Sequence, residues 1–114
     1  MKRLSFIIAL NILSICIFGQ AKNDTAFSES EVVLKTSTGE IYGTLAIPSN
    51  VKVSPVVLII AGSGPTDRDC NSPMGIQTNA YKMLSESFAK NGISTLRFDK
   101  RGIGKSKPAM SSES

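Results

Sequence analysis

The hydrophobic pattern of the chain centres on an unbroken apolar run, Val56–Ile60, which lies between a proline and a glycine-rich loop. Such a run of β-branched and leucine residues predicts a strand buried on both faces, as in a parallel sheet. The loop that follows, Gly62–Pro65, occupies the carboxyl end of this strand, where open α/β sheets place their chemistry. Because its glycines leave backbone N–H groups unshielded, the loop suits a developing negative charge; a ligand-free turn is the alternative interpretation.

The segments before this strand predict an antiparallel hairpin. Val32–Leu34 supports a short strand over Glu31–Ser37, and Glu40–Ile47 alternates between apolar and polar positions as a half-buried strand does. Gly39 lies in the turn between them, where a positive φ is expected. The stretch 22–30 is expected to be a polar leader ahead of the hairpin.

The segments after the central strand predict a helix and a second strand. Thr78–Lys90 has helical periodicity, with a cap at Thr78 or Asn79 and a left-handed stop at Gly92. Ile93–Phe98 is the strand that follows. Strand, helix and strand form a βαβ unit with parallel pairing and a right-handed crossover, so the fold class is α/β. The helix is expected to bury Ala80, Leu84 and Phe88 and to expose Lys82, Ser85, Glu86 and Lys90.

The amino terminus has the composition of a removable signal peptide over 1–21. Lys2 and Arg3 precede the apolar segment Leu4–Phe18, and small residues flank the cleavage position after Ala21. An uncleaved anchor is the alternative, but the apolar segment is short for a bilayer span. The protein is therefore expected to be exported, with no stable membrane span after cleavage.

Charge and cysteine content narrow the function classes. Cleavage removes two of the 13 basic residues and lowers the net charge from +4 to +2, and no basic patch indicates a nucleic-acid partner. Cys70 would then be the single cysteine, so no disulfide framework is expected. The chain has no histidine, and the spacing around Asp67 and Asp69 does not fit a calcium loop. Neither a metal nor a cofactor is predicted.

Two glycine motifs partly match phosphate-binding patterns. Gly104–Ser106 resembles the end of a P-loop, but Asp99 stands where that motif needs its first glycine, and Pro108 follows instead of a helix. The loop after the central strand lacks the third glycine of a dinucleotide fingerprint, because Asp67 occupies that position. A nucleotide-binding, P-loop-like domain is thus a disfavoured alternative.

Ala61–Asp69 follows one predicted strand, and Arg97–Ser106 begins at the end of the next. With the preceding hairpin and the intervening helix, they resemble the amino-terminal portion of the α/β-hydrolase superfamily, in its exported esterase and serine-aminopeptidase-like branch, over about Val32–Ser106. The resemblance implies that the backbone N–H of Ser63 is one oxyanion-hole donor, with Gly62 and Gly64 shaping the loop. It also implies that the loop after the second of these strands is mainly architectural. In that loop, Gly102 and Gly104 permit a tight reversal of the chain, and Asp99 and Arg101 are expected to hold it by hydrogen bonds.

The chain departs from that family where catalysis is concerned. It contains neither a Gly-x-Ser-x-Gly nucleophile motif nor a histidine base. A serine without a base is a weak nucleophile, so Ser63 is interpreted as an N–H donor and not as a nucleophile. The acidic triad member follows the nucleophile in such enzymes, which excludes Asp67, Asp69 and Asp99 from that role.

These observations predict an incomplete α/β-hydrolase domain over 31–107 with a disordered tail at 108–114. The family's strand order, 1-2-4-3-5, implies that Val56–Ile60 lacks its neighbour on one side. We expect a truncated segment of an exported serine hydrolase that is inactive alone, its parent acting on a small-molecule ester or amide. The alternative is a small exported binding or interaction module that uses an exposed sheet edge.

Overall fold

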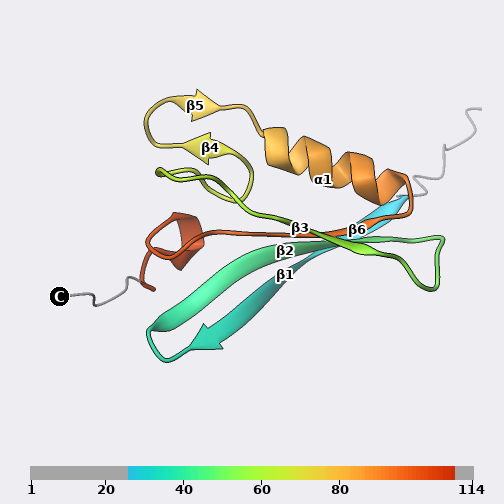
Figure 1. Cartoon of the computed structure of the whole chain (residues 1–114), viewed down its shortest axis with the longest axis horizontal. Coiled ribbons are helices and arrows are strands. Elements are labelled where there is room, and N and C mark those ends of the chain that lie inside the picture. Colours follow the sequence, from blue (N-terminus) through green and yellow to red (C-terminus); the bar gives the residue numbers. More distant parts are fainter. Residues whose placement is uncertain (1–25, 110–114) are drawn as a thin grey trace, which may run out of the picture.

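The structure, a computed structural model, describes residues 26–109. These residues form an α/β domain with a four-stranded mixed sheet, one α-helix and a separate two-stranded hairpin (Figure 1). No helix within 26–109 is long and apolar enough to cross a membrane. In chain order the elements are β1 (Phe27–Thr36), β2 (Gly39–Pro48), β3 (Val56–Ile59), β4 (Asn71–Ser72), β5 (Ile76–Gln77), α1 (Ala80–Lys90), β6 (Ser94–Phe98) and the 3₁₀ helix η1 (Gly104–Ser106).

The predicted hairpin is confirmed, and it is longer than expected. β1 and β2 pair antiparallel from Phe27 opposite Pro48 to Thr36 opposite Gly39. The strand thus begins four residues before Glu31 and takes in the end of the expected leader, because the backbone groups at the end of β2 need hydrogen-bonding partners. The expected signal peptide, 1–21, and the start of the leader lie outside the described residues.

The turn of this hairpin packs against the end of the described chain. Gly39 has a φ of +129°, a region that only glycine adopts readily. A Cβ on Gly39 would lie 2.7 Å from the Cα of Ala109, which is fully buried. Of the tail expected over 108–114, Pro108 and Ala109 are described, and Ala109 is packed rather than disordered; 110–114 lies outside the described residues.

Gly39→Ala is therefore expected to lower the free energy of unfolding by about 2 kcal/mol, because backbone strain adds to overpacking. Gly75→Ala is the matched control, since Gly75 also has a positive φ but would meet no atom within 4 Å. Urea unfolding of both variants measures the difference. Equal losses in the two variants would contradict the close approach of Ala109.

The sheet has the strand order β1-β2-β6-β3, with β6 antiparallel to β2 and parallel to β3. A hairpin followed by a βαβ unit is thus confirmed. β3 is an edge strand, and the expectation that it is buried on both faces is wrong for the described residues. Ile59 is buried at 8% exposure, but Val56, Leu58 and Ile60 are 63%, 51% and 64% exposed. The cause is that these three side chains alternate onto the face of the sheet opposite α1, which no described element covers.

The helix begins and ends close to the expected positions but turns a different face to the sheet. It packs on β6 and β2 through Ser85 and Ala89, which are almost completely buried, whereas Leu84 is exposed. The predictions that Ala80 and Leu84 are buried and that Ser85 is exposed are therefore wrong. The physical reason is the polar surface of β6 beneath the helix, where the Ser85 hydroxyl hydrogen-bonds to the hydroxyl of Thr95 and to Arg97.

The ends of α1 follow the expected chemistry in part. The hydroxyl of Thr78 accepts a hydrogen bond from the N–H of Ala80, while the side chain of Asn79 bonds to Asn71 and caps nothing. Gly92 ends the helix with a φ of +82°, and its N–H donates to the carbonyl of Ala89. The left-handed stop is thus confirmed at Gly92.

The face of the sheet opposite α1 is apolar. The strand registers place alternate residues of all four strands on this face, and they line a groove of about 380 Å³. No described element covers it (Figure 1). Its lining includes Val32, Leu34, Ile41, Leu58, Leu96 and Phe98.

Candidate functional site

The glycine loop, Gly62–Pro65, lies at the carboxyl end of β3 and is exposed along its whole length. A Cβ on Gly62 or Gly64 would meet no atom within 4 Å, so both glycines face open space on that side. Within the described residues, the N–H of Ser63 donates to no hydrogen-bond acceptor. Ser63, the residue expected to offer an N–H donor, is therefore exposed, and its backbone N–H has no acceptor among the described residues.

One side chain contacts this loop by directed hydrogen bonds. The ammonium of Lys100, two residues past the end of β6, donates to the carbonyl oxygens of Gly62 and Gly64, the latter at 2.8 Å. Sequence analysis did not single out Lys100. A basic residue directly after a strand that is parallel to β3 was the available signal, because the carboxyl ends of parallel strands meet at the same edge.

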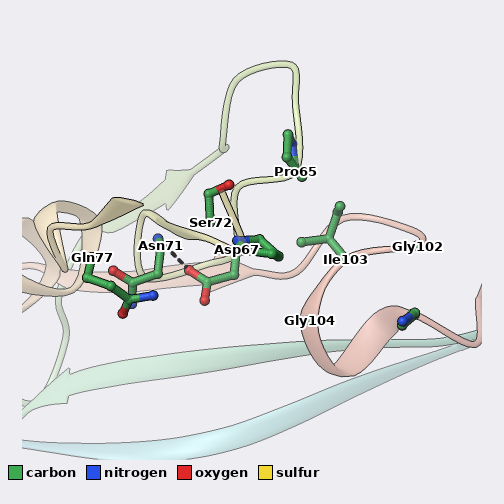
Figure 2. Close-up of a pocket in the computed structure, with 10 residues that line it drawn as sticks. Pro65, Asp67, Asn71, Ser72, Gln77, Gly102, Ile103 and Gly104 are labelled. Atoms are coloured by element: carbon green, nitrogen blue, oxygen red, sulfur yellow. Dashed lines mark hydrogen bonds between the residues drawn. The ribbon is translucent and has the colours of Figure 1, made fainter. Parts of the chain in front are cut away.

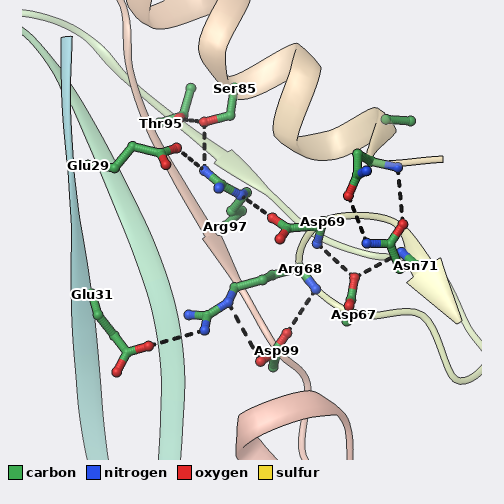
Figure 3. A network of polar contacts seen from close by, with 12 residues as sticks. Glu29, Glu31, Asp67, Arg68, Asp69, Asn71, Ser85, Thr95, Arg97 and Asp99 are labelled. Carbon is green, nitrogen blue, oxygen red and sulfur yellow. Dashed lines mark hydrogen bonds and ion pairs between the residues drawn. The ribbon is translucent and has the colours of Figure 1, made fainter. Parts of the chain in front are cut away.

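The second predicted loop is held by Asp99, as expected. Its buried carboxylate accepts the N–H of Lys105 at 3.0 Å through Oδ2. Through Oδ1 it accepts the N–H of Arg68 at 2.8 Å (Figure 3). Gly104, with a φ of +51°, brings the chain so near that a Cβ there would lie 2.5 Å from Asp99 Oδ2. Gly102 also has a positive φ, of +75°. Asp99 thus closes its own loop and ties it to the loop after β3.

Arg101 contacts a different part of the molecule. Its guanidinium donates to the hydroxyls of Thr38 and Thr36 at the turn between β1 and β2, the latter at 3.3 Å. The described contacts therefore give Arg101 a role in anchoring the hairpin turn. They do not include a bond within its own loop, where the resemblance placed it.

A cavity of about 380 Å³ separates the two loops (Figure 2). The side chains that line it are mostly committed to the protein itself. Asp67 Oδ1 accepts the N–H groups of Asp69 and Asn71 at 2.9 and 2.8 Å, and the Asn71 carboxamide is bonded to Asn79. The lining comprises Pro65, Asp67, Asn71, Ser72, Pro73, Gln77, Gly102, Ile103, Gly104 and Lys107.

One wall of this cavity is the short β4–β5 hairpin, with Asn71 opposite Gln77. The segment Thr66–Pro73 has no apolar alternation that would predict a strand. The hairpin is instead held by polar contacts. Within 26–109, no group of three or more His, Cys, Asp or Glu residues is placed to hold a metal ion.

Behind the cavity, Arg97 joins three elements through one buried guanidinium (Figure 3). Its Nε lies 2.8 Å from Asp69 Oδ1, and its Nη1 lies 2.8 Å from Glu29 Oε1 and 3.1 Å from Ser85 Oγ. Burial by itself lowers the pKa of Arg97, but the hydrogen bonds to Asp69 and Glu29 outweigh it, and the net shift of this pKa is upward. The guanidinium stays charged and fastens β1 and the Asp67–Asp69 segment to α1.

Comparison with protein-family models and with curated proteins finds no match to this chain. The function therefore has to be argued from the sequence and from the geometry of the two loops.

The P-loop-like residues are used for structure. Ser106 is fully buried, and its hydroxyl accepts the N–H of Tyr42 at 2.9 Å. The ammonium of Lys105 pairs with Glu31 at 2.5 Å. η1 spans only three residues, so it offers no extended helix N-terminus to a phosphate. These contacts argue against a nucleotide at Gly104–Ser106.

The Glu31 carboxylate predicts a pH dependence of stability. Its hydrogen bond to Lys105 lowers its pKa from the ordinary value of 4.5, helped by Arg68 at 3.2 Å. A lowered folded-state pKa contributes stability that is present above pH 4.5 and lost as the pH falls through the folded value.

Glu31→Gln is therefore expected to flatten the fall in the free energy of unfolding below pH 4.5. Urea unfolding over a series of acidic pH values measures this slope. Glu86→Gln on α1 is the control, because Glu86 forms no ion pair among the described residues. A slope in the Glu31 variant as steep as in the parent chain would refute the prediction.

Proposed function

We propose that this chain is the amino-terminal part of an exported serine hydrolase that cleaves an ester or an amide. In this proposal, Gly62–Pro65 supplies one backbone donor of the oxyanion hole. The observation that carries it is that Ser63 is an exposed residue at the carboxyl end of β3 whose N–H has no acceptor among the described residues. Backbone N–H groups preorganised in this way stabilise the oxyanion of acyl-transfer reactions.

The sheet topology supports the proposal. β4 and β5 form a separate sheet, so β6 is the fourth strand of the main sheet in chain order. The order β1-β2-β6-β3 is therefore the 1-2-4-3 order that the resemblance to α/β-hydrolases implies. In that order a fifth strand pairs with the outer edge of the third, and the outer edge of β3 has no described partner. The bare apolar face below the sheet likewise fits a fold in which helices cover both faces of a parallel sheet.

The catalytic groups that the proposal needs are absent from this sequence. It has no Gly-x-Ser-x-Gly motif and no histidine. The hydroxyl of Ser63 has no base to activate it, so the 114-residue chain is proposed to be inactive by itself. Nucleophile, acid and base would be encoded downstream, and the substrate pocket with them.

Reading the coding DNA beyond Ser114 in all three frames tests this proposal. The expected result is a Gly-x-Ser-x-Gly motif within a few tens of residues, followed by an Asp or Glu and then by a His, in the order typical of this fold. DNA that encodes no such series in any frame would overturn the proposal.

The exposed edge of β3 favours a second candidate, an exported interaction module that accepts a partner strand by β-augmentation. Val56, Leu58 and Ile60 present apolar side chains beside that edge. This candidate predicts a soluble chain that unfolds cooperatively, and a free energy of unfolding that does not change when the downstream segment is attached. The hydrolase proposal predicts that attachment raises it, because the edge and the bare face become covered.

A further inference from the structure

Lys100 is the side chain that holds the glycine loop. Its ammonium donates to the carbonyl oxygens of both Gly62 and Gly64. Within 26–109, no other side chain hydrogen-bonds to the loop, and a Cβ on either glycine would meet no atom within 4 Å. The conformation of the loop therefore depends on one charged group that comes from the end of β6.

The geometry of the peptide bond turns this contact into an orientation of the donor. The carbonyl of Gly62 and the N–H of Ser63 belong to the same planar peptide, and in a trans peptide they point in opposite directions. Holding the Gly62 oxygen on Lys100 therefore directs the Ser63 N–H away from Lys100. The second carbonyl that Lys100 holds, that of Gly64, belongs to the peptide of Pro65, which has no N–H.

Lys100 thus fixes two peptides, of which only one can donate. Without it, the Gly62–Ser63 peptide would lose the contact that fixes its orientation, and the ψ of Gly62 would be free to vary. A rotated peptide would turn the Ser63 N–H away from the position where a developing anion needs a donor. The charge of the ammonium also polarises the Gly62 carbonyl, which makes the N–H of the same peptide a better donor.

We propose that Lys100 is a positioning residue that orients the Ser63 N–H toward the oxyanion. The effect of Lys100 on catalysis rests on the proposed hydrolase function. Its effect on the orientation of the Gly62–Ser63 peptide does not, because it depends only on contacts within the described residues. Lys100 touches no reacting atom in this proposal and acts only through the backbone of the loop.

Nuclear magnetic resonance of the 114-residue chain tests the orientation directly. The ¹³C signals of the Gly62 and Gly64 carbonyls report the two hydrogen bonds, and the ¹⁵N order parameter of Ser63 reports the rigidity of the peptide. In Lys100→Met, both carbonyl signals are expected to move upfield. The Ser63 order parameter is expected to fall from about 0.85 to below about 0.6.

Two further variants make this result specific. Lys100→Arg keeps the charge and offers N–H donors to both carbonyls, and is expected to restore both carbonyl shifts and the order parameter. Lys105→Met removes a lysine that pairs with Glu31 outside the loop, and is expected to change none of these signals. Unchanged loop signals in Lys100→Met would overturn the proposal, and so would equal changes in Lys105→Met.

A kinetic measurement separates this proposal from the hydrolase proposal. In the chain extended by its downstream segment, Lys100→Met is expected to lower kcat by about tenfold to a hundredfold at an unchanged KM, at most the loss of a whole donor. Lys100→Arg is expected to recover it. Altered loop signals with an unaltered kcat would overturn the role of Lys100 in catalysis, whereas an extended chain without any activity would overturn the hydrolase function itself.

Discussion

Arg97→Leu is expected to lower the free energy of unfolding by about 3 kcal/mol. Arg97 is 2% exposed and ion-pairs with Glu29 and Asp69, so the change breaks a buried ion-pair cluster by removing its centre. The side chains of Glu29 and Asp69 keep 30% and 31% of their surface exposed, which lets water solvate them afterwards. The loss is therefore placed at the lower end of the range for such changes.

Urea unfolding measures this loss, with Arg101→Leu as the matched control. Arg101 is exposed and donates only to threonine hydroxyls, so its removal is expected to cost less than about 1 kcal/mol. A variant at Arg97 as stable as the one at Arg101 would contradict the buried cluster. It would also remove the reason why α1 buries Ser85 in place of Leu84.

Asp99→Ala is expected to cost about 3 kcal/mol, because it leaves the N–H groups of Arg68 and Lys105 without their acceptor in a part-buried setting. It also removes the carboxylate 3.7 Å from the Arg68 Nε, and the Nη1 of Arg68 is already buried without a hydrogen-bond partner. The loops after β3 and β6 would then lose the contact that joins them.

Asp99→Asn separates the two parts of this effect. It keeps one acceptor oxygen and loses the charge, so about half of the loss seen in Asp99→Ala is expected. Hydrogen exchange of the Arg68 and Lys105 amides reports the two bonds individually. Full protection of both amides in Asp99→Ala would contradict this account of the loop junction.

The parts of the fold that sequence predicted are those with local signals. The alternation of apolar and polar residues predicted the hairpin, Gly39 predicted the position of its turn, and Gly92 predicted the end of the helix. The face of α1 was predicted wrongly because apolarity was assumed to mark the buried side. What decides that face is Arg97, whose partners Glu29 and Asp69 are 68 and 28 residues away along the chain. Periodicity over a short window contains no information about such contacts.

The candidate site was predictable to a similar extent. The glycines after the apolar run indicated a loop suited to a developing negative charge, and the donor role of Ser63, which the resemblance implies, stays a prediction. Asp99 was expected to hold the loop after the next strand, and its carboxylate accepts the N–H of Lys105 within that loop. The sequence could indicate a basic residue near the glycine loop but could not assign that place to Lys100 rather than to Arg101, because these adjacent residues reach the glycine loop and the hairpin turn, respectively. Only the three-dimensional path of the loop decides which basic side chain reaches which partner.

The central proposal is that the 114-residue chain supplies one oxyanion-hole donor and that the downstream segment supplies the nucleophile, acid and base. Hydrolysis of p-nitrophenyl acetate is the measurement that tests it most directly. The purified 114-residue chain is predicted to turn this ester over no faster than the buffer blank. The chain extended by its downstream segment is predicted to be active, and to lose that activity when the serine of Gly-x-Ser-x-Gly is replaced by alanine. Turnover by the 114-residue chain well above the blank would contradict the account.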